Sequence, residues 1–328
     1  MTGFRKTRFR NINEMLEATG NGSLCVERAL FLLTLRQSIN GRNLISNKLK
    51  EEMLGALSIG THNYLDFRVD RERLIKREEC FFMTKLKNQT AIITGASSGI
   101  GEAIAHHLAS EGTNVVLAAR RAEKLNELAG EIAEQYNIEA KVIETDVTKR
   151  EDVENLVSET KTAFGSVDIF INNAGVMLLS FLKNDHVEEW EQMVDVNIKG
   201  VLYGIHASLP TMIEQESGHI VNVSSVAGHE VFPSSTVYSA TKYAVKALSM
   251  GMEKELSKSG VRVTNVSPGA VETELTDHIT DGDVIEMFKN RSMDPLEADD
   301  IARAVTYAVT QPSYVNVNEV IVRPMHQK

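Results

Sequence analysis

Short apolar runs and longer amphipathic segments alternate from residue 89 to residue 322. Seven of the runs have the length and composition of buried strands, and they span residues 89–94, 114–119, 140–144, 168–171, 218–223, 261–267 and 319–322. Apolar positions recur with helical spacing at residues 99–111, 121–136, 149–164, 185–217, 236–259 and 296–310. Strands that alternate with amphipathic helices imply a parallel sheet with helices on both faces. We therefore predict an α/β fold, a single doubly wound Rossmann-type domain with a seven-stranded parallel sheet.

The first 82 residues show only weak periodicity. We expect one or two short helices between Leu30 and Leu57, followed by a charged segment from Asp66 to Glu79. Met83 then opens a short polar lead into the first strand, as a natural protein start does. We predict that residues 1–82 form a dispensable N-terminal extension and that residues 83–328 form the folded domain.

Charge is distributed unevenly between these two parts. Residues 1–82 carry 14 Lys and Arg against 10 Asp and Glu, whereas residues 83–328 carry 21 against 35. The acidic main body argues against general nucleic-acid binding. The basic residues within residues 1–10 fit either a targeting peptide or a solvated basic tail, and we favour the tail.

Cysteine content and hydropathy indicate the kind of cellular compartment in which the protein functions. Only Cys25 and Cys80 are present, which argues against a disulfide framework and fits a reducing environment. No apolar run approaches the ~18 residues that a membrane-spanning helix needs. We therefore expect a cytoplasmic protein with no membrane partner.

A glycine-rich turn, Thr94-Gly95-Ala96-Ser97-Ser98-Gly99-Ile100-Gly101, joins the first strand to the first helix. Gly95 permits a sharp turn, while Gly99 and Gly101 allow close approach of a ligand and close packing of the helix. The N-terminus of the helix offers free N–H groups to a pyrophosphate. This glycine spacing favours dinucleotide binding over phosphoryl transfer.

The end of the second strand bears on the choice of dinucleotide. Sites for NAD usually place an acidic residue there, whereas a 2′-phosphate favours arginine. Ala119 followed by Arg120 therefore favours NADP(H) over NAD(H). Asp146 and Val147 follow the third strand, and Asp146 has two interpretations, a helix cap or a contact with adenine.

Three further polar features are ambiguous when each is taken alone. Asn172-Asn173-Ala174-Gly175 ends the fourth strand and fits either a turn or the edge of a cofactor crevice. Asn197 interrupts an apolar helical pattern and needs a polar partner, such as backbone or a buried water. Ser224-Ser225 follows the fifth strand and fits either a turn or a ligand-binding position.

Tyr238 and Lys242 lie four residues apart and therefore share one face of a helix. An ammonium group at ~4 Å, with an effective dielectric constant of ~20, favours phenolate by up to ~4 kcal/mol. That energy corresponds to a lowering of the tyrosine pKa by at most ~3 units, which would make the phenol a useful proton shuttle. An isolated pair of this kind is more often an ordinary surface contact.

Together these motifs resemble the classical short-chain dehydrogenase/reductase family, particularly its small bacterial NADP-dependent oxidoreductases. The resemblance rests on TGASSGIG, NNAG, Asn197, Ser225, YSATK and the Pro268-Gly269 turn, and it covers about residues 88–322. It implies a catalytic tetrad of Asn197, Ser225, Tyr238 and Lys242. In this family pattern Tyr238 moves the proton, Ser225 binds the substrate oxygen, Lys242 also binds the nicotinamide ribose, and Asn197 holds a water.

The resemblance also implies a set of cofactor contacts and no metal. These contacts are Gly95, Ser97, Ser98, Gly99, Ile100, Gly101, Arg120, Asp146, Val147, Asn173, Tyr238, Lys242, Val271 and Thr273. Thr273 resembles the residue that meets the nicotinamide amide, and Glu274 to Asp294 has the composition of a mobile lid. His106 and His107 are expected on the first helix without a ligand function.

We therefore expect an NADP-dependent oxidoreductase that interconverts an alcohol and a carbonyl on a small hydroxy acid, aldehyde or ketone. A cofactor-binding regulator without turnover is the alternative, and a sugar epimerase or dehydratase on the same fold is a third. The family resemblance implies a homodimer or homotetramer formed through residues 185–217 and 236–259.

Overall fold

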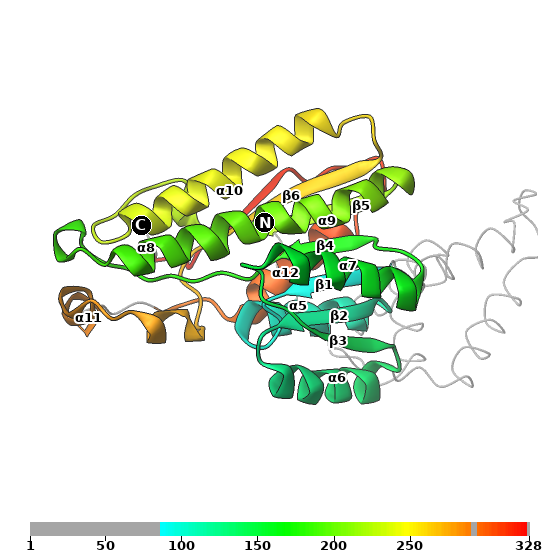
Figure 1. The fold of residues 1–328 in the computed structure, drawn as a ribbon, viewed down its shortest axis with the longest axis horizontal. Coiled ribbons are helices and arrows are strands. Elements are labelled where there is room, and N and C mark those ends of the chain that lie inside the picture. Colours follow the sequence, from blue (N-terminus) through cyan, green and yellow to red (C-terminus); the bar gives the residue numbers. More distant parts are fainter. Residues whose placement is uncertain (1–85, 290–293, 327–328) are drawn as a thin grey trace, which may run out of the picture. The chain divides into compact units, whose positions relative to one another are not determined.

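The computed structural model describes residues 86–289 and 294–326. Within this part, seven parallel strands form one sheet in the order β3-β2-β1-β4-β5-β6-β7 (Figure 1). The strands are β1 Thr90–Thr94, β2 Asn114–Ala119, β3 Ala140–Glu144, β4 Ile169–Asn172, β5 Gly218–Val223, β6 Val261–Pro268 and β7 Glu319–Val322. This confirms the predicted seven-stranded Rossmann-type sheet. The expectations for residues 1–82 and for Cys25 and Cys80 lie outside the described residues.

Helices connect the strands. They are α5 Gly99–Ser110, α6 Ala122–Tyr136, α7 Arg150–Phe164, α8 Val187–Val194, α9 Gly200–Glu214, α10 Thr236–Glu255, α11 Gly282–Lys289 and α12 Ala298–Val309. Four shorter turns of helix are η1 Leu182–Asn184, η2 Asp195–Lys199, η3 Val226–Gly228 and η4 Glu274–His278. The helix predicted over 185–217 is observed as continuous helical backbone over 187–214, in which the π-helical turn η2 joins α8 to α9. Helix α11 was not predicted.

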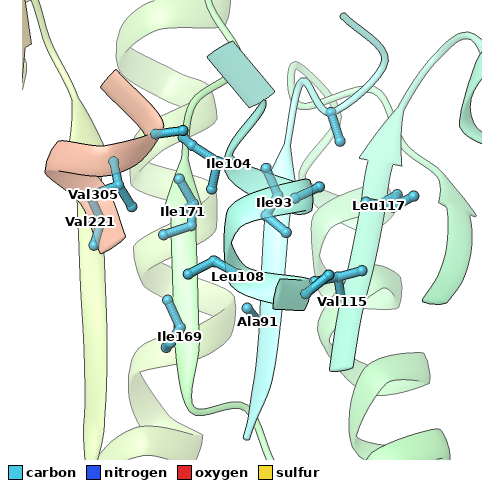
Figure 2. Packing of buried hydrophobic residues seen from close by; sticks show 14 of the residues in the cluster. Ala91, Ile93, Ile104, Leu108, Val115, Leu117, Ile169, Ile171, Val221 and Val305 are labelled. Atoms are coloured by element: carbon cyan, nitrogen blue, oxygen red, sulfur yellow. The ribbon is translucent and has the colours of Figure 1, made fainter. Parts of the chain in front are cut away.

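Both faces of the sheet are buried because side chains alternate along each strand. Ile93 and Leu117 point to one face and pack with Ile104 and Leu108 of α5 (Figure 2). Ile92, from the same strand as Ile93, belongs to the core of the other face. The near-continuous apolar strands in the sequence therefore reflect burial on two sides.

Strands β1 and β4 are neighbours although they are separated along the chain, so the order of connection reverses between them. In open parallel sheets, the loops that leave the carboxyl ends of strands diverge at such a point and form a crevice. The glycine-rich turn after β1 and the NNAG segment after β4 meet at this crevice.

Candidate active site

A cavity of about 540 Å³ lies at the carboxyl ends of the strands. Most of the predicted site residues line it: Gly95, Ser97, Ser98, Gly99, Ile100, Arg120, Asp146, Val147, Asn173, Ser225, Tyr238, Lys242, Val271 and Thr273. Gly101 and Asn197 are predicted site residues that do not line the cavity. The tertiary structure thus brings segments from six connecting loops and helix α10 to one place.

The glycine-rich turn is held tightly against the loop that follows β4. Gly95 has a φ of 66°, and a Cβ added there would lie 2.8 Å from Cα of Ala174. A Cβ on Gly101 would lie 2.3 Å from the carbonyl oxygen of Gly95. Gly101 therefore serves close packing of α5 under the turn, and the cavity itself is lined by its neighbours.

Thr94 and Asn173 fasten the turn to the end of β4. Thr94 Oγ1 donates to the carbonyl of Ile171 at 3.1 Å and accepts from the N–H groups of Asn173 at 3.0 Å and Ala174 at 3.1 Å. Asn173 Nδ2 in turn donates to the carbonyl oxygens of Thr94 at 2.9 Å and Gly95 at 3.3 Å. Asn173 is thus a scaffold for the turn as well as a residue of the cavity wall, and Thr94 had been given no role from the sequence.

Arg121 is the arginine that contacts the turn directly. Its Nε donates to Ser97 Oγ at 3.0 Å, and a terminal nitrogen donates to Ser98 Oγ at 2.6 Å. Arg120 also lines the cavity, and its charge contributes to the low pKa of Asp146. Arg120 was the predicted arginine, and Arg121 lies one residue further along at the N-cap of α6 and was not predicted.

Asp146 adopts a local turn at the cavity wall. Its Oδ1 accepts from the backbone N–H of Thr148 at 3.0 Å and from Thr148 Oγ1 at 2.8 Å. Burial raises the pKa of Asp146, but these hydrogen bonds and the nearby positive charges outweigh it, so the net shift is downward. The bonds end at Thr148 and do not cap α7, whose N-cap is Lys149, so the helix-cap interpretation is wrong. The position of Asp146 on the cavity wall leaves the adenine contact open.

Asn197 lies in the π-helical turn η2 and faces the protein interior. Its Oδ1 accepts from the N–H of Val176 at 2.9 Å, and its Nδ2 donates to the carbonyl of Val176 at 2.9 Å and to Thr241 Oγ1 at 3.1 Å. The expected polar partner is therefore backbone. Asn197 fixes the loop after β4 to helix α10, one residue before Lys242.

Ser225 caps the short turn η3, since its Oγ accepts from the N–H of Ala227 at 3.1 Å. The neighbouring Ser224 faces the other way, and its hydroxyl donates to the carbonyl of Lys242 at 3.0 Å. Ser225 lines the cavity and its hydroxyl also hydrogen-bonds with Tyr238. Position in the fold thus distinguishes the two adjacent serines.

Tyr238 and Lys242 are both buried on α10, and the lysine Nζ lies 5.8 Å from the centre of the tyrosine ring. Burial raises the pKa of Tyr238 to about 12, although the hydrogen bond with Ser225 lowers it in part. Burial also lowers the pKa of Lys242 to about 8, and its Nζ donates to the carbonyl of Val223 at 3.0 Å. The expected lowering of the tyrosine pKa was therefore wrong in direction, because desolvation of the buried phenol outweighs the hydrogen bond with Ser225.

The predicted lid, Glu274 to Asp294, follows Thr273, whose Oγ1 accepts from the N–H of Leu275 at 3.4 Å and so caps η4. Glu274 extends from η4 to the opposite rim, where it pairs with Arg121 at 2.8 Å and with Lys124 at 3.1 Å. These bonds lower the pKa of Glu274 to about 2. The described part of the segment 274–294 includes α11, and residues 290–293 lie outside the described residues.

The described residues contain neither a cluster with the arrangement of a metal site nor a helix able to cross a membrane. Across residues 86–289 and 294–326, no cluster of His, Cys, Asp and Glu side chains has the arrangement of a metal site. His107 on α5 instead contacts Asp299 of α12 at 2.5 Å, while His106 stacks edge-on against Tyr136. In the same part of the chain, no helix is long and apolar enough to cross a membrane.

Comparison with known proteins assigns the family. The model of the short-chain dehydrogenase family matches residues 89–283. The chain belongs to this family. As a short-chain dehydrogenase it is an oxidoreductase that acts on CH–OH groups.

Its relatives include bacterial oxidoreductases. An uncharacterized oxidoreductase of Staphylococcus aureus strain MW2 is 50% identical over 243 residues, which is 74% of this chain and 100% of the relative. One from Staphylococcus saprophyticus is 47% identical over 251 residues, covering 75% of this chain and 99% of the relative.

Solved structures of similar fold support the same assignment. An alcohol dehydrogenase from the archaeon Thermococcus sibiricus, complexed with 5-hydroxy-NADP, has a TM-score of 0.66 and 31% identity, covering 73% of this chain and 98% of that one. The serine dehydrogenase of Escherichia coli has a TM-score of 0.63 and 31% identity, covering 73% of this chain and 100% of that one.

Proposed function

We propose that the protein is an NADP(H)-dependent oxidoreductase that interconverts a small alcohol and its carbonyl, with Tyr238 as the general acid and base. The observation that carries the proposal is the meeting of Tyr238, Ser225 and Lys242 with the glycine-rich turn and two arginines in one cavity. Solved relatives that hold NADP or a derivative of it support the same cofactor.

The residues present fit a dinucleotide. A Cβ on Gly99 would lie 3.2 Å from Cγ2 of Thr273, so a side chain there would close the gap between the turn and η4. Arg120 and Arg121 would hold a 2′-phosphate, because a guanidinium group pairs well with phosphate oxygens. The bound nicotinamide would supply or accept the hydride.

The protein's own side chains would then control the proton and the orientation of the substrate. Tyr238 would donate its proton to the oxygen of the carbonyl that is being reduced, or withdraw one from the alcohol in the opposite direction. Ser225 would donate a hydrogen bond to the same oxygen and hold it in line. Lys242 would bind the nicotinamide ribose, and Asn197 would keep Lys242 and the loop after β4 in register.

Replacement of Tyr238 by Phe tests this proposal. We expect Tyr238→Phe to lose most turnover, on the order of 10²-fold or more, because no proton donor remains at the carbonyl oxygen. NADPH binding, followed by fluorescence or calorimetry, should be retained. Full turnover in the variant would show that Tyr238 is not the acid, and absence of turnover in the wild type with retained binding would favour a regulator.

Cofactor preference is tested separately by comparing NADPH with NADH against a panel of carbonyl compounds. We expect NADPH to give the higher kcat/KM by about 10-fold or more, because each charge-assisted hydrogen bond to the 2′-phosphate contributes ~1.5–3 kcal/mol. Strong preference for NADH would overturn this part of the proposal.

The assembly proposed is a homodimer or homotetramer. Large apolar side chains are exposed on α9 and α10, among them Leu202 and Ile213 on α9 and Tyr243 and Met250 on α10. Such a face is costly to leave in water and supports association through these helices. Light scattering on purified protein measures the number of subunits, and a monomer at micromolar concentration would contradict the proposal.

A further inference from the structure

The cavity has two chemically different ends. The polar end holds the glycine-rich turn, Arg120, Arg121 and Asp146. The other end surrounds Tyr238 with apolar side chains that both line the cavity and pack in one hydrophobic cluster with the tyrosine: Val176, Met177, Leu179, Ala227, Phe232 and Phe288. A substrate whose carbonyl meets Tyr238 must place the rest of its atoms against these side chains.

The described part of the cavity wall holds three permanent cations, Arg120, Arg121 and Lys242, and the two arginines belong to the polar end. Arg121 is bound to Ser97, Ser98 and Glu274 at the polar end. Lys242 is buried and donates to the backbone of Val223. His278 on η4 also lines the cavity, but an imidazole is not a permanent cation as an ammonium or guanidinium group is.

A carboxylate already stands in the cavity wall. Glu230 lines the cavity, and its Oε1 accepts from Arg323 at 2.7 Å. The guanidinium group of Arg323 is therefore paired with a protein carboxylate. A substrate carboxylate would find this guanidinium group already paired and would lie against the apolar wall, where an unpaired charge is costly to bury.

We propose that the substrate is a neutral, mainly apolar ketone or aldehyde, or the corresponding alcohol, and that analogues bearing a carboxylate are poor substrates. This inference rests on the proposed oxidoreductase function and narrows it, because it removes the hydroxy acids from the expected substrates. It also separates this chain from the serine dehydrogenases of similar fold, whose named substrate is charged at neutral pH.

Pairs of compounds that differ only by methyl and carboxylate test the inference. Butanone is matched with acetoacetate, and p-tolualdehyde with p-carboxybenzaldehyde, and the reduction of each is followed by the loss of NADPH absorbance. We expect the neutral member to have the higher kcat/KM in each pair, by about 10-fold or more. A carboxylate member that reacts equally well or faster would overturn the inference and leave the proposed oxidoreductase function intact. Failure of all carbonyl compounds, with NADPH still bound, would overturn both.

A variant with a matched control tests whether the substrate lies at the apolar end of the cavity. Met177→Arg places a cation at the apolar end, and Met325→Arg makes the same change at a residue that is 92% exposed and outside the cavity. We expect Met177→Arg to shift the ratio of kcat/KM values toward the carboxylate member by about 10-fold, and Met325→Arg to leave the ratio unchanged. An unchanged ratio in a folded Met177→Arg protein would contradict the placement of the substrate at this end.

Discussion

At the scale of single residues, burial decides the protonation of the two central side chains. Tyr238 is only 7% exposed and Lys242 only 6% exposed, so water stabilises neither phenolate nor ammonium. The phenol is therefore held protonated at neutral pH, while the ammonium loses its proton more easily than usual. A protonated phenol suits the proposed reduction of a carbonyl, in which Tyr238 would act as the acid.

This protonation state predicts different pH profiles for the two directions. Oxidation of an alcohol needs phenolate, so its kcat/KM should rise about 10-fold per pH unit from neutral pH toward the raised pKa of Tyr238. Reduction needs the neutral phenol and should not show this rise. Initial rates over a pH series measure both profiles, with NADP binding measured at each pH as a control. A plateau in oxidation from about pH 7 would show that the bound cofactor lowers the tyrosine pKa.

The buried lysine predicts a conflict between stability and activity. The pKa of Lys242 falls from 10.5 to about 8, so burying the charged form costs about 3 kcal/mol at neutral pH. Lys242→Met removes this cost but also leaves the carbonyl of Val223 without its donor, at ~1–3 kcal/mol. We expect a net gain of about 1 kcal/mol and a rise in Tm of ~2–4 °C at neutral pH, with activity lost.

The lowered pKa of Lys242 also determines the direction in which the stability of the folded protein changes with pH. Between about 8 and 10.5 the unfolded chain binds more protons at this lysine than the folded chain does, so the wild type gains stability as the pH rises. Lys242→Met lacks this gain, and its advantage in thermal melts should shrink toward about pH 10. A lower Tm for the variant at neutral pH would contradict the account.

At the scale of elements, the segment after β6 is tied across the cavity by charge. Glu274 of η4 pairs with Arg121 and Lys124, which belong to the N-terminal end of α6. All three side chains are between 44% and 48% exposed, so each pair contributes at most ~1 kcal/mol. The tether therefore affects the mobility of η4 and α11 far more than global stability.

Glu274→Gln tests the tether. We expect faster amide hydrogen exchange in η4 and α11, with Tm changed by no more than ~2 °C, because only exposed ion pairs are lost. Glu272→Gln, two residues away on the exposed surface, is the matched control and should leave exchange unchanged. Because the pKa of Glu274 is lowered to about 2, the tether is present above the ordinary glutamate range and is lost only as the pH falls toward that value. Equal exchange in both variants would contradict a tethering role.

At the scale of the whole molecule, the Rossmann-type domain accounts for the similarity to known proteins. The Staphylococcus aureus relative aligns over its entire length with 74% of this chain. The family model begins at residue 89, so both comparisons concern less than the whole chain.

We therefore predict that residues 83–328, expressed alone, fold and retain carbonyl reduction. Their kcat/KM should lie within about 3-fold of the full chain, and their Tm within the ~2–4 °C that ~1 kcal/mol corresponds to in a domain of this size. Circular dichroism and NADPH-linked rates on both proteins measure these quantities. An insoluble or inactive product would show that the first 82 residues are required.

The sequence predicted the sheet, and most of the residues that it singled out line the cavity, because these signals are local. Strand and helix periods are visible in windows of about ten residues, and they placed all seven strands within one residue of their observed bounds. The glycine-rich turn and the spacing between Ser225 and Tyr238 are equally local. The π-helical turn η2 was not predicted, because it follows the same apolar pattern as the helices on either side of it.

The amino-acid sequence by itself determined the order of strands and helices, the dinucleotide turn and the pair of Tyr238 with Lys242. Only the tertiary structure decided that Arg121 binds the serines of the turn, that Asn197 holds the backbone of Val176, and that burial raises the pKa of the phenol. The physical reason is that these properties depend on partners distant in sequence and on exclusion of water. Local spacing specifies neither.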